Sequence, residues 1–335
     1  MQQALTQAFH APDITALTAI TPDTLAQGAT APVEQYRLFH IEGPDTARFL
    51  QGQSTCDINQ LSTAQSLTGA FCTPKGRAYA LFRVISRREG AVLVRLPAAI
   101  ADDVVTQLQK YLMLFKAEMT PANDWMMLGA TGQQAITVFT DSVPEPDAVT
   151  PIESGYVTGT TPLPDGTPRA EIWLDGQSLT PSACAEKAFR PAPPRAWALS
   201  EILAGLTTLS KETAGAYVPQ NLNLHATDAI SFNKGCYTGQ EVVARMHFLG
   251  ELKKSLFRLE ITNADPLPAT GDELSTPEGR KVGSITDALQ DDEGVTHALA
   301  VLSHTILDSG VSLADRPGAS VTLAPMGYQV PEQQA

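Results

Sequence analysis

Cysteine is scarce in this sequence and is never closely paired. Among 335 residues there are four cysteines, Cys56, Cys72, Cys184 and Cys236, and none belongs to a C-x-x-C pair, which argues against a disulfide framework and an ordinary zinc site. No stretch approaches about 18 uninterrupted apolar residues, the length that crosses a membrane. The first twenty residues also lack the basic flank of a signal peptide and the arginines of a transit peptide. We therefore expect a cytoplasmic protein.

Positive charge is also in short supply. Lys and Arg number 23 against 36 Asp and Glu, which gives a formal net charge of −13. Such a surface repels a phosphate backbone, and the two dense basic pairs, Arg87-Arg88 and Lys253-Lys254, are typical of solvated strand edges. The sequence therefore argues against direct tight binding of tRNA or DNA.

The secondary structure expected from the sequence pattern indicates an α+β protein. A strand is expected at 36–43, and the alternating pattern between 67 and 97 predicts antiparallel strands. Residues 98–118 carry apolar side chains at helical spacing. Together these elements indicate one α+β unit, and the length of the chain predicts two or three domains in all.

The second half of the chain predicts a further sheet, a helix and a barrel. Residues 141–168 are rich in Pro, Gly and Thr and are expected to form a long surface connection. A helix is expected from about Ala196 to Ala204, with Gly205 as its C-cap. The short, regularly spaced strands after Lys254 predict a terminal β-barrel.

One stretch, "NKGCYTGQEVVAR" at 233–245, places a cysteine where it could react. Thr238 and Glu241 have the spacing of a capping box, which predicts a helix that begins just after Cys236. The neighbouring glycines permit a tight turn, and a helix N-terminus with Lys234 nearby would stabilise a thiolate. This chemistry suits a reactive or metal-binding cysteine. The alternative is a small buried hydrophobic residue beneath a turn.

The same stretch closely resembles the signature of the YgfZ family of folate-binding proteins. These proteins are relatives of the glycine-cleavage T-protein, an aminomethyltransferase, and act in iron–sulfur cluster assembly or repair and in tRNA modification. Supporting segments are "FLQGQSTCDINQL" (49–61), "CTPKGRAYA" (72–80) and "GRKVGSIT" (279–286), in family order. The family's K-G-C-Y-x-G-Q-E core falls on Lys234, Gly235, Cys236, Tyr237, Gly239, Gln240 and Glu241, followed by Arg245.

The resemblance implies a three-domain, T-protein-like α+β fold around a central hole or cleft. The folate-binding α+β domain would comprise 1–40 and 119–245, with a second α+β domain inserted at 41–118 and a β-barrel at 246–335. Tetrahydrofolate or a derivative is the implied ligand, and Trp197 and Tyr36 are the implied aromatic contacts. The expected protein partners are iron–sulfur assembly proteins or client enzymes. No permanently bound metal is expected, and Cys236 would be a transient cluster ligand.

One departure from the T-protein pattern bears on catalysis. Aminomethyltransferases carry acidic residues in the stretch that here reads "KGRAYALFR" (75–83), and Tyr79, Ala80 and Leu81 supply no carboxylate for proton transfer. We therefore expect a folate-binding accessory protein rather than a glycine-cleavage enzyme. Two alternatives remain, namely a folate-dependent one-carbon transferase that uses Cys236 and a structural module that binds protein partners.

Overall fold

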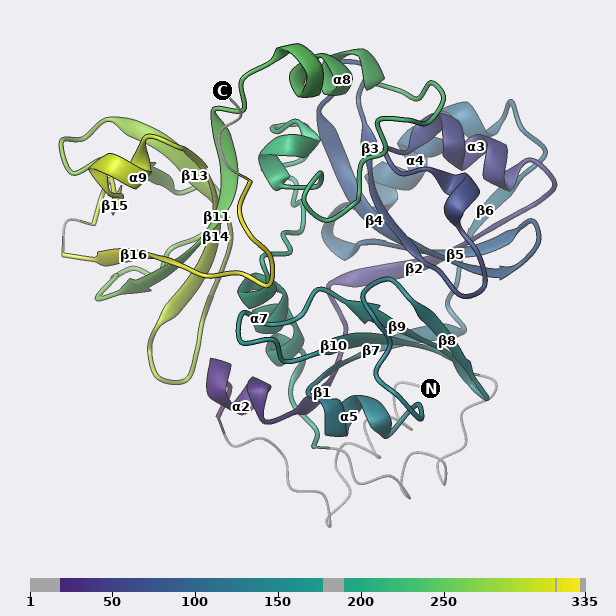
Figure 1. The fold of residues 1–335 in the computed structure, drawn as a ribbon, viewed down its shortest axis with the longest axis horizontal. Coiled ribbons are helices and arrows are strands. Elements are labelled where there is room, and N and C mark those ends of the chain that lie inside the picture. The colour runs from purple at the N-terminus through teal and green to yellow at the C-terminus, as the bar shows by residue number, and fades with distance from the viewer. Residues whose placement is uncertain (1–18, 177–189, 317, 332–335) are drawn as a thin grey trace.

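The computed structural model describes residues 19–176, 190–316 and 318–331, which form three antiparallel sheets around a central region (Figure 1). None of the helices in these ranges is both long and apolar enough to cross a membrane. The first sheet has the order β1-β7-β10-β9-β8. Its strands are β1 (Ala29–Pro32), β7 (Trp125–Thr131), β10 (Arg169–Asp175), β9 (Gly155–Thr160) and β8 (Val149–Ile152).

The second sheet is inserted in sequence between the first two strands of the first sheet. Its order is β3-β4-β5-β2-β6. The strands are β3 (Leu67–Cys72), β4 (Ala78–Arg88), β5 (Ala91–Pro97), β2 (Tyr36–Glu42) and β6 (Glu118–Pro121). The predicted boundaries at 41 and 118 are therefore displaced, because β2 pairs with β5 along its whole length from Tyr36 opposite Pro97. Tyr36 consequently belongs to the inserted sheet and not to the flanking one.

Helices α3 (Thr46–Gln53) and α4 (Ala101–Leu112) accompany the second sheet, with the short 3-10 turns η1 (Ile58–Gln60) and η2 (Ala98–Ile100). The amphipathic pattern that predicts a helix over 98–118 is confirmed for α4, whose apolar face buries Val104, Leu108 and Leu112. The helix ends earlier than expected, because the chain turns at 113–116 to begin β6.

The third sheet is the expected barrel-like unit. Its order is β15-β12-β13-β14-β11-β16, and the two edge strands approach each other. Its strands are β11 (Lys254–Thr262), β12 (Glu273–Ser275), β13 (Lys281–Gln290), β14 (Thr296–Ser303), β15 (Ser312–Leu313) and β16 (Ser320–Ala324), with α9 (Ile306–Ser309) beside them. The predicted start at 246 falls inside α8 (Gln240–Leu249), so the barrel begins at β11.

Helix α7 (Pro194–Ala204) is the central connector and contacts both the first sheet and the barrel (Figure 1). Its composition suits this position, because most of its residues are apolar and eight of its eleven residues are buried. Gly205 ends it in the left-handed conformation, with φ of 81°, as predicted. The remaining elements are α2 (Pro22–Ala26), α5 (Gln133–Thr137) and η3 (Pro219–Leu222).

Candidate functional site

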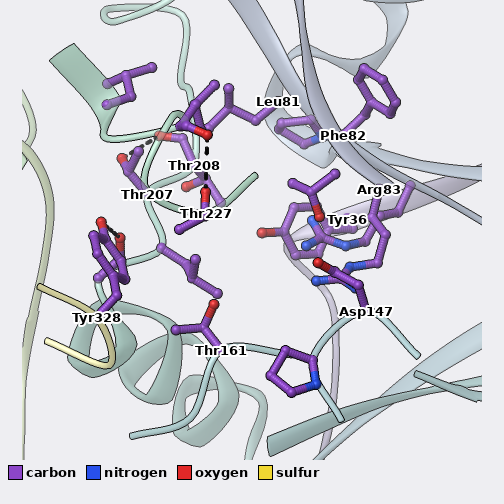
Figure 2. Close-up of a pocket in the computed structure, with 18 residues that line it drawn as sticks. Tyr36, Leu81, Phe82, Arg83, Asp147, Thr161, Thr207, Thr208, Thr227 and Tyr328 are labelled. Carbon is purple, nitrogen blue, oxygen red and sulfur yellow. Dashed lines mark hydrogen bonds and ion pairs between the residues drawn. The ribbon is translucent and has the colours of Figure 1, made fainter. Parts of the chain in front are cut away.

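A cleft lies where the three sheets meet and encloses about 690 Å³ of empty space, including part of its opening to solvent. Figure 2 shows Tyr36, Arg83 and Asp147 on one side and Thr207, Thr208 and Tyr328 on the other. The lining comes from β2–β5, from loops of the first sheet, from the segment after α7 and from the segment after β16. The residues are Tyr36, Thr68, Leu81, Phe82, Arg83, Arg95, Pro97, Pro146, Asp147, Thr161, Gly205, Leu206, Thr207, Thr208, Leu222, Leu224, Thr227 and Tyr328.

Tyr36 is held in the cleft wall by buried charged groups. The Arg95 guanidinium carbon lies 3.9 Å from the centre of the Tyr36 ring, and the Tyr36 hydroxyl donates to Glu201 Oε1 at 3.1 Å. Burial raises the pKa of Tyr36 well above its ordinary value, so the phenol stays neutral and keeps donating. Arg95 also binds Glu171, with Nη2 3.0 Å from Oε1. Tyr36 therefore offers the cleft a ring that is already covered by a cation on one face.

Asp147 and Arg83 form an ion pair on the same side. The Arg83 Nη1 atom donates to Asp147 Oδ1 at 2.6 Å, and the two side chains are 4% and 28% exposed. Arg83 also donates to Ser66 Oγ at 3.0 Å and to Thr160 Oγ1 at 3.1 Å. Sequence reasoning did not identify Asp147 as a site residue, because it lies in the stretch 141–168 that is expected to be a surface connection. The one feature of the sequence that could have indicated this site residue is an acidic side chain among turn-forming residues.

Hydroxyl groups line the opposite side of the cleft. Thr207 and Thr208 both donate to the carboxylate of Asp287 on β13, Thr208 at 2.8 Å. The Tyr328 hydroxyl donates to the Gly205 carbonyl at 2.9 Å. These bonds tie the segment after α7 to the barrel, so this side is a fixed, uncharged polar wall.

Trp197 does not line the cleft, so the expectation that its ring and that of Tyr36 line a shared cleft is wrong. It is 1% exposed and packs in the core beneath the first sheet. The Arg169 guanidinium covers its ring at 4.3 Å. A Cβ atom at Gly129 would lie 2.1 Å from Trp197 ring carbons, so the indole occupies the space which that glycine leaves open. Trp197 supports the wall from behind.

Cys236 is exposed on the loop before α8, which excludes the buried alternative. Cys56 and Cys72 are buried, and burial raises their pKa values to about 11 and about 12. Cys184 lies outside the described residues. Of the three thiols that the structure describes, Cys236 is thus the accessible one.

Lys234 anchors the Cys236 loop to helix α3. Its ammonium donates to the carbonyls of Gln51 at 2.9 Å, Ser54 at 2.8 Å and Cys56 at 2.6 Å. A cation at the C-terminal end of a helix satisfies free carbonyls and complements the helix dipole. Burial lowers the pKa of Lys234 to about 8. The expectation that this ammonium serves the thiolate directly is not supported, since its donors are used by carbonyls in α3 and just after it.

The predicted capping box at α8 is wrong. The N-cap is Gly239, with φ of 85° and no side-chain cap, while Thr238 donates to Gln53 at 3.3 Å. A Cβ atom at Gly239 would lie 2.5 Å from the Thr73 carbonyl oxygen, so glycine is required there for its conformation and for its close packing.

The other residues of the motif have separate positions. Gln240 accepts a bond from the Tyr237 backbone N–H at 3.3 Å, and Tyr237 is itself buried. Gly235, Glu241 and Arg245 are exposed. Neither Cys236 nor any other residue of 233–245 lines the cleft. The structure therefore separates the two sites that the sequence suggested. Within its described ranges it contains no group of three His, Cys, Asp or Glu side chains able to hold a metal ion.

Comparisons with known proteins find relatives over most of the chain. The tRNA-modifying protein YgfZ of Colwellia psychrerythraea is 33% identical over 277 residues, covering 81% of this chain and 84% of the relative. That of Klebsiella pneumoniae is 30% identical over 327 residues, covering 94% and 99%. No family model matches the sequence.

A solved structure matches the whole architecture. Aminomethyltransferase T of the glycine cleavage system from Bartonella henselae aligns with a TM-score of 0.66 and 16% identity, over 91% of this chain and 90% of the other. At that identity the likeness shows the fold, and it confirms the predicted T-protein-like α+β fold. By sequence, the chain belongs to the YgfZ family.

Proposed function

We propose that this chain is a cytoplasmic, folate-binding accessory protein that supports iron–sulfur cluster assembly or repair and, through client enzymes, tRNA modification. Its relatives are named tRNA-modifying proteins. The net charge of −13 disfavours direct binding to a phosphate backbone. The effect on tRNA would therefore pass through the enzymes that the protein supports.

The central cleft is the observation that carries the folate proposal. It is lined jointly by the inserted sheet, by loops of the first sheet and by the segment after α7, and concave sites where several elements meet are typical of small-ligand sites. Leu81, Phe82 and Pro97 supply apolar wall, which suits a flat ring system. Polar groups stand on two opposite sides (Figure 2). The residues present therefore fit a folate, which is a flat pterin joined to a benzoyl-glutamate.

The composition of the cleft disfavours aminomethyl transfer. Leu81 lines the wall and Ala80 is fully buried beside it, so this strand brings no carboxylate to the ligand. The lining carboxylate is Asp147, and it is ion-paired with Arg83. A proton acceptor free to work at a folate nitrogen is thus missing from the β4 wall.

A folate-dependent one-carbon transferase that uses Cys236 is less well supported. Such an enzyme needs its thiol beside the bound folate, and Cys236 is not among the cleft-lining residues. Its exposure suits contact with something outside the protein, such as a cluster iron, a persulfide or a partner's thiol.

Calorimetric titration with tetrahydrofolate tests the ligand. Leu81→Trp would fill the cleft from its β4 wall and should abolish binding. Leu323→Trp is the matched control, because Leu323 is 42% exposed on β16, away from the cleft. Absence of binding to the unaltered protein would refute the folate proposal. Binding that survives Leu81→Trp would refute its location.

The accessory role is tested in cells that lack the native gene. Cys236→Ser should fail to restore the activity of iron–sulfur enzymes, whereas the purified variant should bind tetrahydrofolate normally. Formation of methylenetetrahydrofolate by the pure protein, with the other glycine-cleavage components supplied, would favour the transferase instead.

A further inference from the structure

Asp147 is held rigidly at the edge of the cleft. Its backbone has φ of 65°, a left-handed conformation that aspartate tolerates at some cost. Its N–H donates to the Gly159 carbonyl at 2.9 Å, and its carbonyl accepts from the Ser66 N–H at 2.8 Å and the Ser66 hydroxyl at 2.9 Å. Three hydrogen bonds thus hold the Asp147 backbone in place, although it lies outside the helices and strands.

The Asp147 carboxylate retains unused acceptor capacity. Oδ1 accepts from Arg83, whereas no group of the described residues donates a hydrogen bond to Oδ2. Each carboxylate oxygen has two acceptor positions, so both oxygens can take a further donor. Arg83 also has partners in Ser66, Gly159 and Thr160, so the pair persists when a ligand shares the carboxylate.

Asp147 is also the single acidic residue among those that line the cleft. Glu171 and Glu201 are 1% and 3% exposed and are bound to Arg95 and to Tyr36. These two carboxylates stabilise the cleft wall, so Asp147 is the acidic residue that can contact the ligand.

We propose that Asp147 determines ligand specificity and orientation in the cleft by accepting two adjacent N–H groups from the edge of a planar ring. The inference rests on the folate function proposed above, since the 2-amino-4-oxopyrimidine edge of a pterin presents such a donor pair. Two parallel N–H···O bonds to a carboxylate fix direction as well as strength. The ring edge would lie at the Arg83–Asp147 side, and the benzoyl-glutamate would extend toward the threonine side.

The test measures the affinity of three probes for the purified protein: tetrahydrofolate, a tetrahydropterin without the benzoyl-glutamate, and p-aminobenzoyl-glutamate. Asp147→Asn replaces one acceptor with a donor. The variant should bind tetrahydrofolate and the tetrahydropterin about 10- to 100-fold more weakly, because charge-assisted hydrogen bonds are lost. Binding of p-aminobenzoyl-glutamate should not change. Asp103→Asn, on the exposed face of α4, is the charge-matched control and should alter none of the three.

A second arm uses the unaltered protein, so that it does not depend on folding of the variant. A tetrahydropterin whose 2-amino group is replaced by methyl should bind about 10- to 100-fold more weakly than its parent. In Asp147→Asn that difference should shrink.

The outcomes separate the two proposals. If tetrahydrofolate binds and neither the Asp147 variant nor the 2-methyl probe weakens binding, the role of Asp147 is refuted while the folate function stands. If the unaltered protein binds neither tetrahydrofolate nor the tetrahydropterin, both are refuted.

Discussion

The guanidinium of Arg169 lies 4.3 Å from the centre of the Trp197 indole, and both side chains are 1% exposed. Arg169 also donates to Ser200 Oγ at 3.1 Å and to the Thr161 carbonyl at 3.0 Å. The pair joins α7 to the first sheet beneath the cleft. Trp197 is therefore part of the frame that holds the site.

Replacing Trp197 should change stability without changing ligand contact. Trp197→Phe leaves a cavity under Arg169 and should lower the free energy of unfolding by about 1–3 kcal/mol, within the range of core truncations. Tetrahydrofolate affinity of the folded variant should equal that of the unaltered protein. Urea unfolding and calorimetric titration measure the two quantities. Weakened affinity at unchanged stability would instead place the indole against the ligand.

Any side chain at Gly129 on β7 should destabilise the protein. In Gly129→Ala the new Cβ would lie 2.1 Å from Trp197 ring carbons, and such overpacking typically costs about 1–3 kcal/mol. Gly52→Ala is the matched control, because Gly52 lies in α3 with no atom within 4 Å of the new Cβ. That control should be neutral or stabilising by up to about 1 kcal/mol. Equal melting temperatures for both variants would show that the indole moves aside freely.

Lys234 should stabilise the loop that carries Cys236. Lys234→Met keeps the length of the side chain but removes the ammonium that donates to three carbonyls, which should cost about 1–3 kcal/mol and increase hydrogen exchange at 233–239. Lys211→Met, at an exposed position, is the control. Unchanged exchange in the Lys234 variant would contradict the anchoring role.

The lowered pKa of Lys234 predicts that the stability of the protein depends on pH. Burial lowers the pKa of Lys234 from 10.5 to about 8 in the folded protein, so between these values the unfolded chain binds more protons than the folded one. Stability must then rise with pH. Denaturant titrations should show the unaltered protein gaining stability relative to Lys234→Met as the pH is raised from 8 to 10. A constant difference would mean that Lys234 titrates normally.

Alkylation should distinguish the three described thiols. In a Cys184→Ser background at pH 7.5, iodoacetamide should label Cys236 first, since Cys56 and Cys72 are buried and their raised pKa values keep them protonated. Peptide mass spectrometry over time measures the order. Early labelling of either buried thiol would contradict the packing described here.

Local sequence predicted the elements well where one physical signal dominated. The apolar spacing of Val104, Leu108 and Leu112 specifies one face of a helix, and the glycine-rich surroundings of Cys236 indicate an exposed turn. At α8 a local signal competed with a tertiary contact. Thr238 and Glu241 have capping spacing, but Thr238 is drawn to Gln53 on α3, a contact between residues distant in sequence.

The composition of the cleft was harder to predict for the same reason. Trp197 looked available for stacking, yet its environment is set by Gly129, which permits the indole to enter the core. Asp147 looked like a surface residue, yet bonds to Gly159 and Ser66 turn it toward Arg83. Both outcomes depend on tertiary contacts that no window of adjacent residues contains.

The cleft wall includes both Tyr36 and Tyr328, so it joins nearly the first and nearly the last described parts of the chain. During synthesis the chain emerges from its N-terminus, and the wall remains open on one side until Tyr328 can bind the Gly205 carbonyl. A ligand that contacts both sides of the cleft would therefore bind only after Tyr328 has been synthesised and packed. Ligand binding would then protect from proteolysis the chains that contain Tyr328, while chains that stop before it would gain no such protection.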